Sequence, residues 1–221
     1  MNDDTSPAVD VRSRMINAAI VLFGRKGVDQ VPLRELTARA GVSLASVNYH
    51  FGSKEELATL VFEELSRRVN ARRLRGLDRI EAECRRSGVR PALEDIVASF
   101  IEPYVGASHV DEGLLLSRLI LRHRMSPSAI TATLMRRHFD PMAGRYIAAF
   151  ATACPDVAPE EFPWRYTFMV STVVLTMTDR HKDSRLIRLS GGSADPTDAQ
   201  ALAAALAGFL YGAMRVPFAP S

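Results

Sequence analysis

Residues 31–57 read VPLRELTARAGVSLASVNYHFGSKEEL, and two helices with a turn between them can be recognised in this stretch. Its apolar residues recur at helical spacing in two short segments, 32–40 and 43–51. Gly41 stands between the segments, and glycine reaches the positive φ of a tight turn without steric cost. Ser43 is a good N-cap for the second segment. Two short helices joined by a glycine-containing turn predict a helix-turn-helix.

Helical patterns extend on both sides of this motif. A first helix is expected from Asp10 until Gly24 and Gly27 close it, since apolar side chains recur every three or four residues. Ser53-Lys-Glu-Glu56 has the spacing of a capping box and begins a long helix that becomes arginine-rich. Asp195-Pro196 is expected to start the last helix. No strand-like alternation occurs in the sequence. Further helices are expected at residues 91–105, 111–124, 127–152, 160–181 and 196–214.

The chain is therefore expected to be all-α, with a small N-terminal unit and a larger C-terminal unit. Residues 1–9 are expected to form a disordered lead, and residues 10–52 a three-helix module that contains the helix-turn-helix. Residues 53–221 are expected to form the larger helical domain, in which the helix at residues 53–76 connects the two units.

The composition is that of a globular protein, with 221 residues of which 47% are hydrophobic and 24% charged. The net charge of +3 permits a nucleic-acid partner without demanding one. Cys84 and Cys154 form no CxxC pair, which favours free thiols in a reducing cytosol over a disulfide framework or a zinc site. The acidic start is not a signal peptide, and the longest apolar run, residues 166–177, is shorter than the ~20 residues of a membrane helix. We therefore expect a cytoplasmic, water-soluble protein without membrane contact.

In a helix-turn-helix the second helix enters the major groove of DNA, and its N-terminal residues approach the base edges. Lys54 stands at the start of the next helix, where it can pair with phosphate or remain a solvated charge. His50 has two alternatives, a catalytic or metal-binding role and packing on the first helix, but no partner at ligand spacing stands on its own helix. The side chains that do not face the module core, and are therefore available to DNA, are Arg34, Leu44, Ala45, Ser46, Asn48, Tyr49 and His50.

The module is not basic overall, because seven Lys and Arg up to residue 57 are balanced by seven Asp and Glu. Affinity for DNA must then come from individually placed contacts, from the positive ends of helix dipoles and from a doubled site. Two linked modules would gain by effective concentration and would read half-sites about 34–36 Å apart, or a multiple of that distance.

The stretch resembles the DNA-binding signature of the TetR/AcrR family of bacterial transcriptional regulators. The AGVS turn, the aromatic residue before His-Phe and the Ser-Lys-Glu helix start carry this resemblance, which covers about residues 12–65. It implies an all-α homodimer whose N-terminal module binds operator DNA and whose variable C-terminal domain binds a small ligand and dimerises.

Carried over by position, the resemblance implies that bases are read by Leu44, Ala45 and Ser46. It implies phosphate contacts by Asn48, Tyr49, His50 and Lys54. Two positions depart from the family pattern. Val31-Pro32 stands where a threonine or serine often opens the second helix, and Asn48 stands where tyrosine is common, so that Asn48 contacts either phosphate or a base.

The last two helices supply a candidate dimer interface. The helix at 196–214 has an alanine-rich apolar stripe, which permits close helix approach: Ala199, Leu202, Ala203, Leu206, Phe209, Leu210 and Ala213. The helix at 160–181 is apolar on nearly all sides, with Phe168, Val170, Val173 and Val174, and must be buried on more than one side. Packing both helices against their symmetry mates would give a four-helix interface, and burial in the monomer core alone is the alternative.

The larger domain also offers candidate ligand contacts: Phe100, Tyr104, Arg118, Arg165, Phe168 and Met169. Core packing is the alternative for the apolar residues, and structural ion pairs are the alternative for the two arginines. The segments FPWRYTFMV and RLSGGSADP are similar to a TetR subgroup that contains fatty-acid-related regulators. This similarity implies a small hydrophobic effector, such as a fatty acid or an acyl-CoA.

These observations together predict a ligand-responsive transcriptional repressor that binds a palindromic operator as a homodimer. A transcriptional activator and a ligand-independent DNA-binding protein are the alternatives. An enzyme is not expected, because no nucleophile elbow, phosphate-binding glycine loop or metal pair occurs in the sequence, and neither a cofactor nor a metal site is expected.

Overall fold

The computed structural model describes residues 7–106 and 110–218, in which the side chains of residues 7–10, 46–48, 110 and 111 are left undescribed. Over these ranges the chain forms helices and no strand, so the all-α prediction is confirmed. The elements are α1 (Pro7–Lys26), α2 (Leu33–Ala40), α3 (Leu44–Phe51), α4 (Lys54–Ser87), α5 (Leu93–Val105), α6 (Val110–Met125), α7 (Ala129–His138), α8 (Asp140–Ala153), the 3-10 helix η1 (Pro159–Glu161), α9 (Phe162–Thr178), α10 (Arg185–Leu189) and α11 (Ala199–Arg215).

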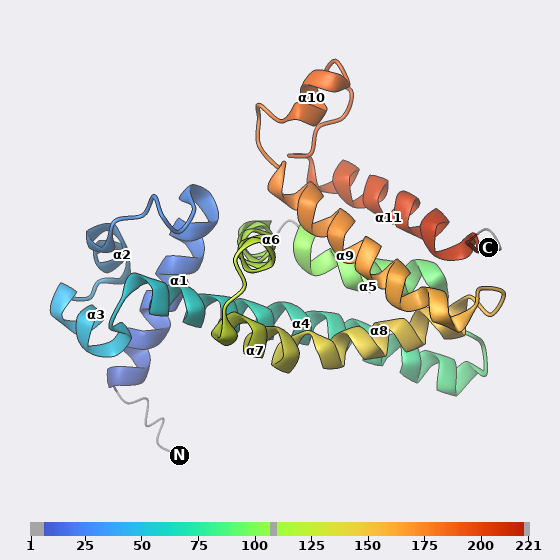
Figure 1. The fold of residues 1–221 in the computed structure, drawn as a ribbon, viewed down its shortest axis with the longest axis horizontal. Coiled ribbons are helices and arrows are strands. Elements are labelled where there is room, and N and C mark those ends of the chain that lie inside the picture. Colours follow the sequence, from blue (N-terminus) through green and yellow to red (C-terminus); the bar gives the residue numbers. More distant parts are fainter. Residues whose placement is uncertain (1–6, 107–109, 219–221) are drawn as a thin grey trace.

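The helices form a small unit and a larger unit that share one long helix (Figure 1). The small unit consists of α1, α2 and α3, and α4 leaves it and runs the length of the larger unit, with α7 and α8 alongside (Figure 1). Helices α5, α6, α9 and α11 complete the larger unit, and α10 projects from it on its connecting loops. None of the helices in the described ranges is both long and apolar enough to cross a membrane.

Gly41 and Ser53, which stand on either side of α3, act as the sequence predicts. Gly41 ends α2 in the left-handed region, with φ 65°, and α3 begins at Leu44, directly after Ser43. Ser53 caps α4, because its side-chain oxygen accepts the backbone N–H of Glu56 at 3.1 Å. Gly41 therefore ends α2 and Ser53 begins α4.

The first helix is longer than expected at both ends. It begins at Pro7, so residues 7–9 are helical and only residues 1–6 of the expected lead remain, outside the described residues. Gly24 lies within α1, and the helix ends at Lys26, after which Gly27 adopts φ 83° and donates its N–H to the carbonyl of Phe23. Gly27 rather than Gly24 is thus the terminating glycine.

The expected helix at residues 127–152 is wrong, because the structure has two helices with Phe139 at their junction. Pro141 explains the break. Proline has no N–H for an intrahelical hydrogen bond, and its ring clashes with the carbonyl four residues earlier, so it fits the first turn of a new helix. It occupies that place in α8.

The C-terminal elements also differ from expectation. The loop between the last two long helices contains α10, capped by the side chain of Ser184. Helix α11 starts at Ala199, because Asp198 is the N-cap and accepts the backbone N–H groups of Gln200 and Ala201. Asp195 instead caps the preceding turn, where it accepts hydrogen bonds from the backbone N–H and the hydroxyl of Thr197. The expected helix at 160–181 begins as η1 and continues as α9.

Candidate nucleic-acid interface

The small unit has its own packed core, which fixes α3 on its surface. Helices α1, α2 and α3 and the start of α4 bury Met15, Phe23, Leu36 and Phe51, each 2% exposed or less. Leu36, Ala40 and Phe51 face inward as the spacing predicts, while Leu33 and Val42 are half-buried against the core. The side chain of Val47 lies outside the described residues.

One face of α3 carries large side chains that the chain itself does not cover. Leu44 is 51% exposed and Tyr49 is 86% exposed, and Ala45 beside Leu44 is exposed as well. Because Ala45 is small, a partner surface can approach the N-terminal end of the helix closely. The candidate residues Ser46 and Asn48 lie on the same helix, but their side chains are outside the described residues.

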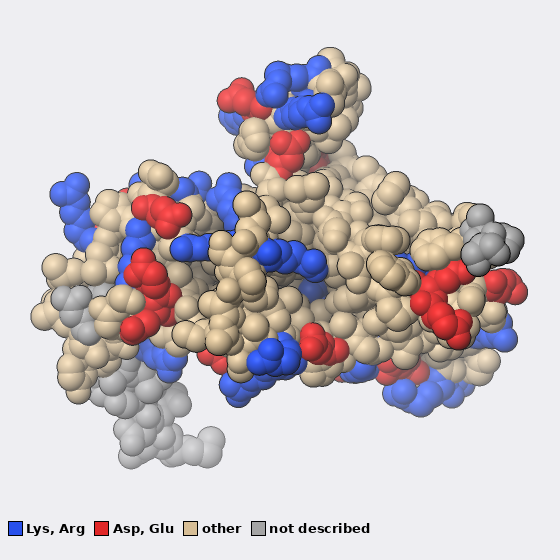
Figure 2. All heavy atoms as spheres, in the orientation of Figure 1, with Lys and Arg blue, Asp and Glu red and all other residues tan. Residues whose placement is uncertain are grey.

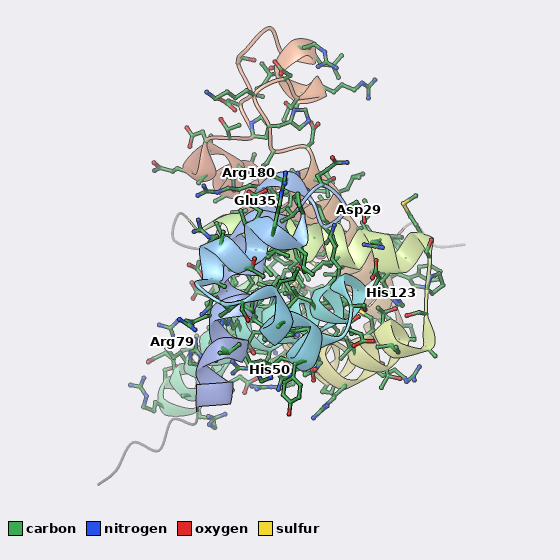
Figure 3. All side chains as sticks on the ribbon, turned by 90° about the vertical axis from the view of Figure 1, so that its left-hand side faces the viewer. Asp29, Glu35, His50, Arg79, His123 and Arg180 are labelled. Atoms are coloured by element: carbon green, nitrogen blue, oxygen red, sulfur yellow. The ribbon has the colours of Figure 1, made fainter. Side chains whose placement is uncertain are left out.

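His50 is half-buried between the surface and the core. The ring of Tyr49 lies edge-on to the His50 ring, with 5.0 Å between centroids, and the Phe51 ring lies 6.3 Å from His50. Figure 3 looks onto this end of the molecule and shows His50 on the edge of the module away from Glu35 and Asp29. No group of three or more His, Cys, Asp or Glu side chains that could hold a metal ion occurs among the described residues.

The two flanking basic residues differ in their surroundings. Arg34 on α2 is exposed. Lys54 is half-buried, and its amino group donates a hydrogen bond of 3.1 Å to the backbone carbonyl of Asp29 in the loop between α1 and α2. In the free protein Lys54 therefore ties the start of α4 to that loop, and a phosphate would compete for the same N–H donors.

The surface around the module carries both signs of charge. Figure 2 shows basic and acidic side chains interspersed over this end of the visible face rather than a single basic patch. One of the pairs is Lys26–Glu35, with 2.6 Å between Nζ and Oε1. This face therefore agrees with the charge balance counted from the sequence, and individual contacts must supply affinity for a polyanion.

Arginines join the small unit to the larger one. Arg118 on α6 donates a hydrogen bond of 2.7 Å to the carbonyl of Gly24 near the end of α1. Arg68 on α4 contacts Asn17 of α1 at 2.9 Å, Glu64 at 2.6 Å and Glu112 of α6 at 3.3 Å. Arg118, expected from the sequence as a ligand contact or a structural pair, therefore lies at the junction of the units.

Sequence reasoning missed this role of Arg68. Arg67 and Arg68 both pair with Glu64, and the hydrogen bond from Arg67 lowers the pKa of the Glu64 carboxyl. The spacing of four residues between Glu64 and Arg68 was the available signal. The contact of Arg68 with Glu112 joins residues 44 positions apart and could not be predicted from spacing.

The other candidate ligand residues do not form one cluster. Phe100, Tyr104 and Met169 are buried in the larger unit, and the rings of Phe100 and Tyr104 are 6.4 Å apart. Phe168, by contrast, is 53% exposed on the outer side of α9. Arg165 is buried, and its guanidinium is engaged at the joint of α9 and α11 by the carboxylate of Glu161 and the carbonyls of Ala213 and Val216.

Helices α9 and α11 together present an uncovered apolar face. Its large side chains are Trp164 (62% exposed), Phe168 (53%), Leu175 (64%) and Phe209 (63%). Around Phe209, α11 exposes small residues: Ala201, Ala204, Ala205, Gly208 and Gly212. The residues predicted for the dimer interface lie on two different faces of these helices. The monomer core buries five of them: Leu202, Leu206 and Leu210 of α11, and Val173 and Val174 of α9.

Comparisons with known proteins concern both units. Residues 15–61 match the family described as bacterial regulatory proteins, tetR family, and residues 98–213 match the tetracyclin repressor-like C-terminal domain. A curated relative, the HTH-type transcriptional dual regulator CecR of Shigella flexneri, is 26% identical over 149 residues, which is 65% of each chain. The chain thus matches slightly less than two thirds of that relative's length.

Solved structures share the fold. A regulatory protein of the tetR family from Rhodococcus RHA1 superposes with a TM-score of 0.62 at 22% identity, over 96% of this chain and 98% of the other. A tetR-family transcriptional regulator from Streptomyces coelicolor gives a TM-score of 0.58 at 20% identity, over 92% of this chain and 79% of the other.

Proposed function

Because the chain belongs to the TetR family of bacterial regulatory proteins, we propose that it is a transcriptional repressor that binds a palindromic operator as a homodimer and is released by a small hydrophobic effector. The observation that carries this proposal is the outer face of α3, where Leu44 and Tyr49 are exposed on a packed three-helix module. Such a regulator acts on chromosomal DNA and therefore in the cytoplasm.

The proposed contacts follow from position along α3. Leu44, Ala45 and Ser46 lie in its first turn, which approaches base edges when the helix enters the major groove. Leu44 suits apolar contact with a thymine methyl group, and the Ser46 hydroxyl suits a hydrogen bond to a base. The remaining candidates are proposed to contact phosphates, which position the helix in the groove: Arg34, Asn48, Tyr49, His50 and Lys54.

Dimerisation is proposed through the apolar face of α9 and α11. A face with four large apolar side chains, each more than half exposed, is unusual on a monomer and typical of a protein–protein interface. The small residues around Phe209 permit close approach of a second α11. A two-fold pair would present two copies of α3 to half-sites about 34–36 Å apart, or a multiple of that distance, on one duplex.

The contacts of α4 and α6 support a route from effector to DNA. An effector changes DNA affinity only if it favours one spacing of the two modules over another. Helix α4 belongs to both units, and Arg118 of α6 holds the end of α1 through Gly24. A shift of α6 inside the larger unit would therefore move the DNA-binding module.

The effector class and the sign of regulation are part of the proposal. The likeness of the C-terminal half to fatty-acid-related regulators makes fatty acids and acyl-CoA the first compounds to test, by thermal shift and by release from operator DNA. The matched relative is named a dual regulator, so activation of the target promoter is the second candidate function after repression. A reporter fused to the target promoter, measured with and without the gene for this protein, separates the two.

Genome-wide footprinting tests the central proposal. A few palindromic sites, among them the protein's own promoter, are the expected result. Broad occupancy with weak sequence preference would instead indicate a ligand-independent chromosome-binding protein and would remove the regulatory proposal.

Two single variants test the phosphate contacts. Tyr49→Phe removes only a hydroxyl that is free of the protein core, and we expect it to weaken binding to every operator by about fivefold, since one hydrogen bond is lost. Lys54→Ala should weaken binding similarly and reduce the slope of log K against log salt by about one. Fluorescence anisotropy at several salt concentrations measures both effects.

The matched control for the lysine is Lys182→Ala, which removes an exposed lysine from the loop before α10. It should leave the affinity and the salt slope unchanged. If Tyr49→Phe and Lys54→Ala also bind operator DNA like the unaltered protein, the phosphate roles assigned to these two residues are wrong.

A further inference from the structure

Arg73 is a fully buried cation in the centre of the larger unit. It lies on α4 and is 1% exposed, on the same helical stripe as the buried residues Val69 and Leu77. Its Nε donates a hydrogen bond of 3.1 Å to the carbonyl of Phe100, and its Nη1 donates one of 3.2 Å to Oδ1 of Asn70. Both acceptors are neutral, so neither compensates the charge.

The guanidinium has unused hydrogen-bonding capacity. Its Nη2 is buried and makes no hydrogen bond with the described residues, and no carboxylate within this part of the chain forms an ion pair with it. Burying a charge is costly unless it is paired. The other deeply buried arginine, Arg165, follows that rule through Glu161. An added anion would therefore pair with the charge of Arg73 and accept a hydrogen bond from its Nη2.

Aromatic side chains surround this cation. The guanidinium carbon lies 3.9 Å from the centroid of the Phe100 ring and 4.4 Å from that of Tyr104. Tyr146 and Tyr166 meet the Phe100 ring edge-on, at 5.2 Å and 5.9 Å between centroids. The rings pack directly against one another and against the guanidinium, so a ligand that reaches Arg73 must displace part of this packing and would then lie on an apolar surface.

One of the tyrosines has a weak partner of its own. Among the described residues, the hydroxyl of Tyr166 reaches only the sulfur of Met142, at 3.9 Å, and thioether sulfur is a poor acceptor. Burial raises the pKa of Tyr166, so the hydroxyl keeps its proton at neutral pH. It is thus a second hydrogen-bond donor near Arg73 that a better acceptor could use.

A groove between α4 and α5 borders the cluster. It has a volume of about 460 Å³, and Gly76 and Ser99 line it on the side of the cluster. Its charged lining residues are of both signs: Arg72, Arg79, Glu83, Asp95 and Glu102. The Ser99 hydroxyl lies 3.0 Å from the hydroxyl of Tyr146, which in turn donates to the backbone carbonyl of Arg73 at 3.2 Å. A ligand entering from this groove would have to displace the Ser99–Tyr146 contact and would then meet the guanidinium.

We propose that Arg73 binds the carboxylate of a small monoanionic effector whose apolar body packs against Phe100, Tyr104, Tyr146 and Tyr166. A carboxylate oxygen would accept a charge-assisted hydrogen bond from the unpartnered Nη2. A second negative charge would be buried without a partner, which excludes dianions. Of the two effector classes named under the proposed function, this selects the fatty acid over the polyanionic acyl-CoA. This inference rests on the proposed function, because it names the chemical class of the effector.

The test uses the purified full-length chain and three acids, benzoate, phenylacetate and octanoate, each beside its neutral primary amide. Isothermal titration calorimetry and thermal shift are the measurements. We expect at least one acid to bind, and its amide to bind at least tenfold more weakly, since the amide cannot form a charge-assisted pair. This comparison needs no variant, so a folding defect cannot obscure it.

Variants then test whether Arg73 is the cation that binds the acid. Arg73→Met should weaken binding of the acid at least tenfold and bring it level with the amide, and Arg73→Lys should retain part of the difference. The matched control is Arg145→Met, which removes a half-buried arginine of α8 whose partners are Asp78 and Glu81, both at 2.8 Å. It should leave acid binding unchanged.

Three results would overturn the proposal: acids and amides that bind alike, acid binding that persists in Arg73→Met, or no binding of any acid. If no acid binds while a neutral hydrophobic compound releases operator DNA, the Arg73 site is wrong and the proposed repressor function stands. If acids bind through Arg73 but the protein recognises no operator, the site stands and the proposed function is wrong.

Discussion

A double variant carrying Phe168→Glu and Phe209→Glu is expected to be a monomer in solution and to bind operator DNA at least a hundredfold more weakly than the unaltered protein. Both side chains point away from the monomer core, at 53% and 63% exposure, so the substitutions should not disturb folding. In a dimer through this face the new carboxylates would be buried without partners, which costs several kcal/mol. Operator binding falls with the dimer, because the two half-sites are no longer linked.

Analytical ultracentrifugation and fluorescence anisotropy measure the two effects. Ile130→Glu is the matched control, since Ile130 is also 63% exposed but lies on α7, away from this face. A third variant, Gly208→Leu, adds bulk where a Cβ would have no neighbour within 4 Å in the monomer. It should fold normally and still weaken the dimer. A double variant that remains dimeric would show that α9 and α11 do not form the interface.

Gly113→Ala is expected to destabilise the protein by about 3 kcal/mol, at the upper end of the usual cost of overpacking. A Cβ at this position of α6 would lie 2.3 Å from the backbone oxygen of Tyr104 and 2.6 Å from its Cα. These are backbone atoms of α5, so a side-chain rotation cannot relieve the overlap, and the two helices must separate. For a chain of this length the melting temperature should fall by about 6 to 12 °C.

Gly144→Ala is the matched control, because Gly144 also lies within a helix, α8, but a Cβ there would have no neighbour within 4 Å. Alanine in an exposed helix position is favoured over glycine by about 0.5–1 kcal/mol, so this variant should be slightly more stable. Calorimetry at a fixed protein concentration compares the two. Equal melting temperatures for both variants would mean that α5 and α6 do not approach closely at Gly113.

The helix-turn-helix could be predicted from the sequence because its signals are local. Gly41 and Ser53 act on the residues next to them, and apolar spacing shows which side of a short helix is buried. The resemblance to the TetR family rests on the same residues and is confirmed by the family matches. The break at Pro141 was also a local signal, but regular apolar spacing on both sides of it concealed the end of α7.

The tertiary contacts of long side chains could not be predicted from local signals. Arg118 reaches the carbonyl of a residue 94 positions earlier, and Arg73 is buried although the arginine-rich segment around it suggests a solvated surface. Helices that are apolar on most sides posed the same difficulty. Only the packing of α11 on α5 shows that Leu206 faces inward while Phe209 faces outward.

Because α4 is one unbroken helix, a small tilt of it inside the larger unit displaces its N-terminal end by a much larger distance. At a rise of about 1.5 Å per residue, the 19 residues between Lys54 and Arg73 span about 28 Å. A tilt of about 7° about Arg73 would carry the N-terminal end of the helix through about 3.4 Å, which is the spacing of successive base pairs. A rearrangement too small to alter the fold of either unit would thus suffice to shift the two α3 helices of a dimer by one base pair relative to their half-sites.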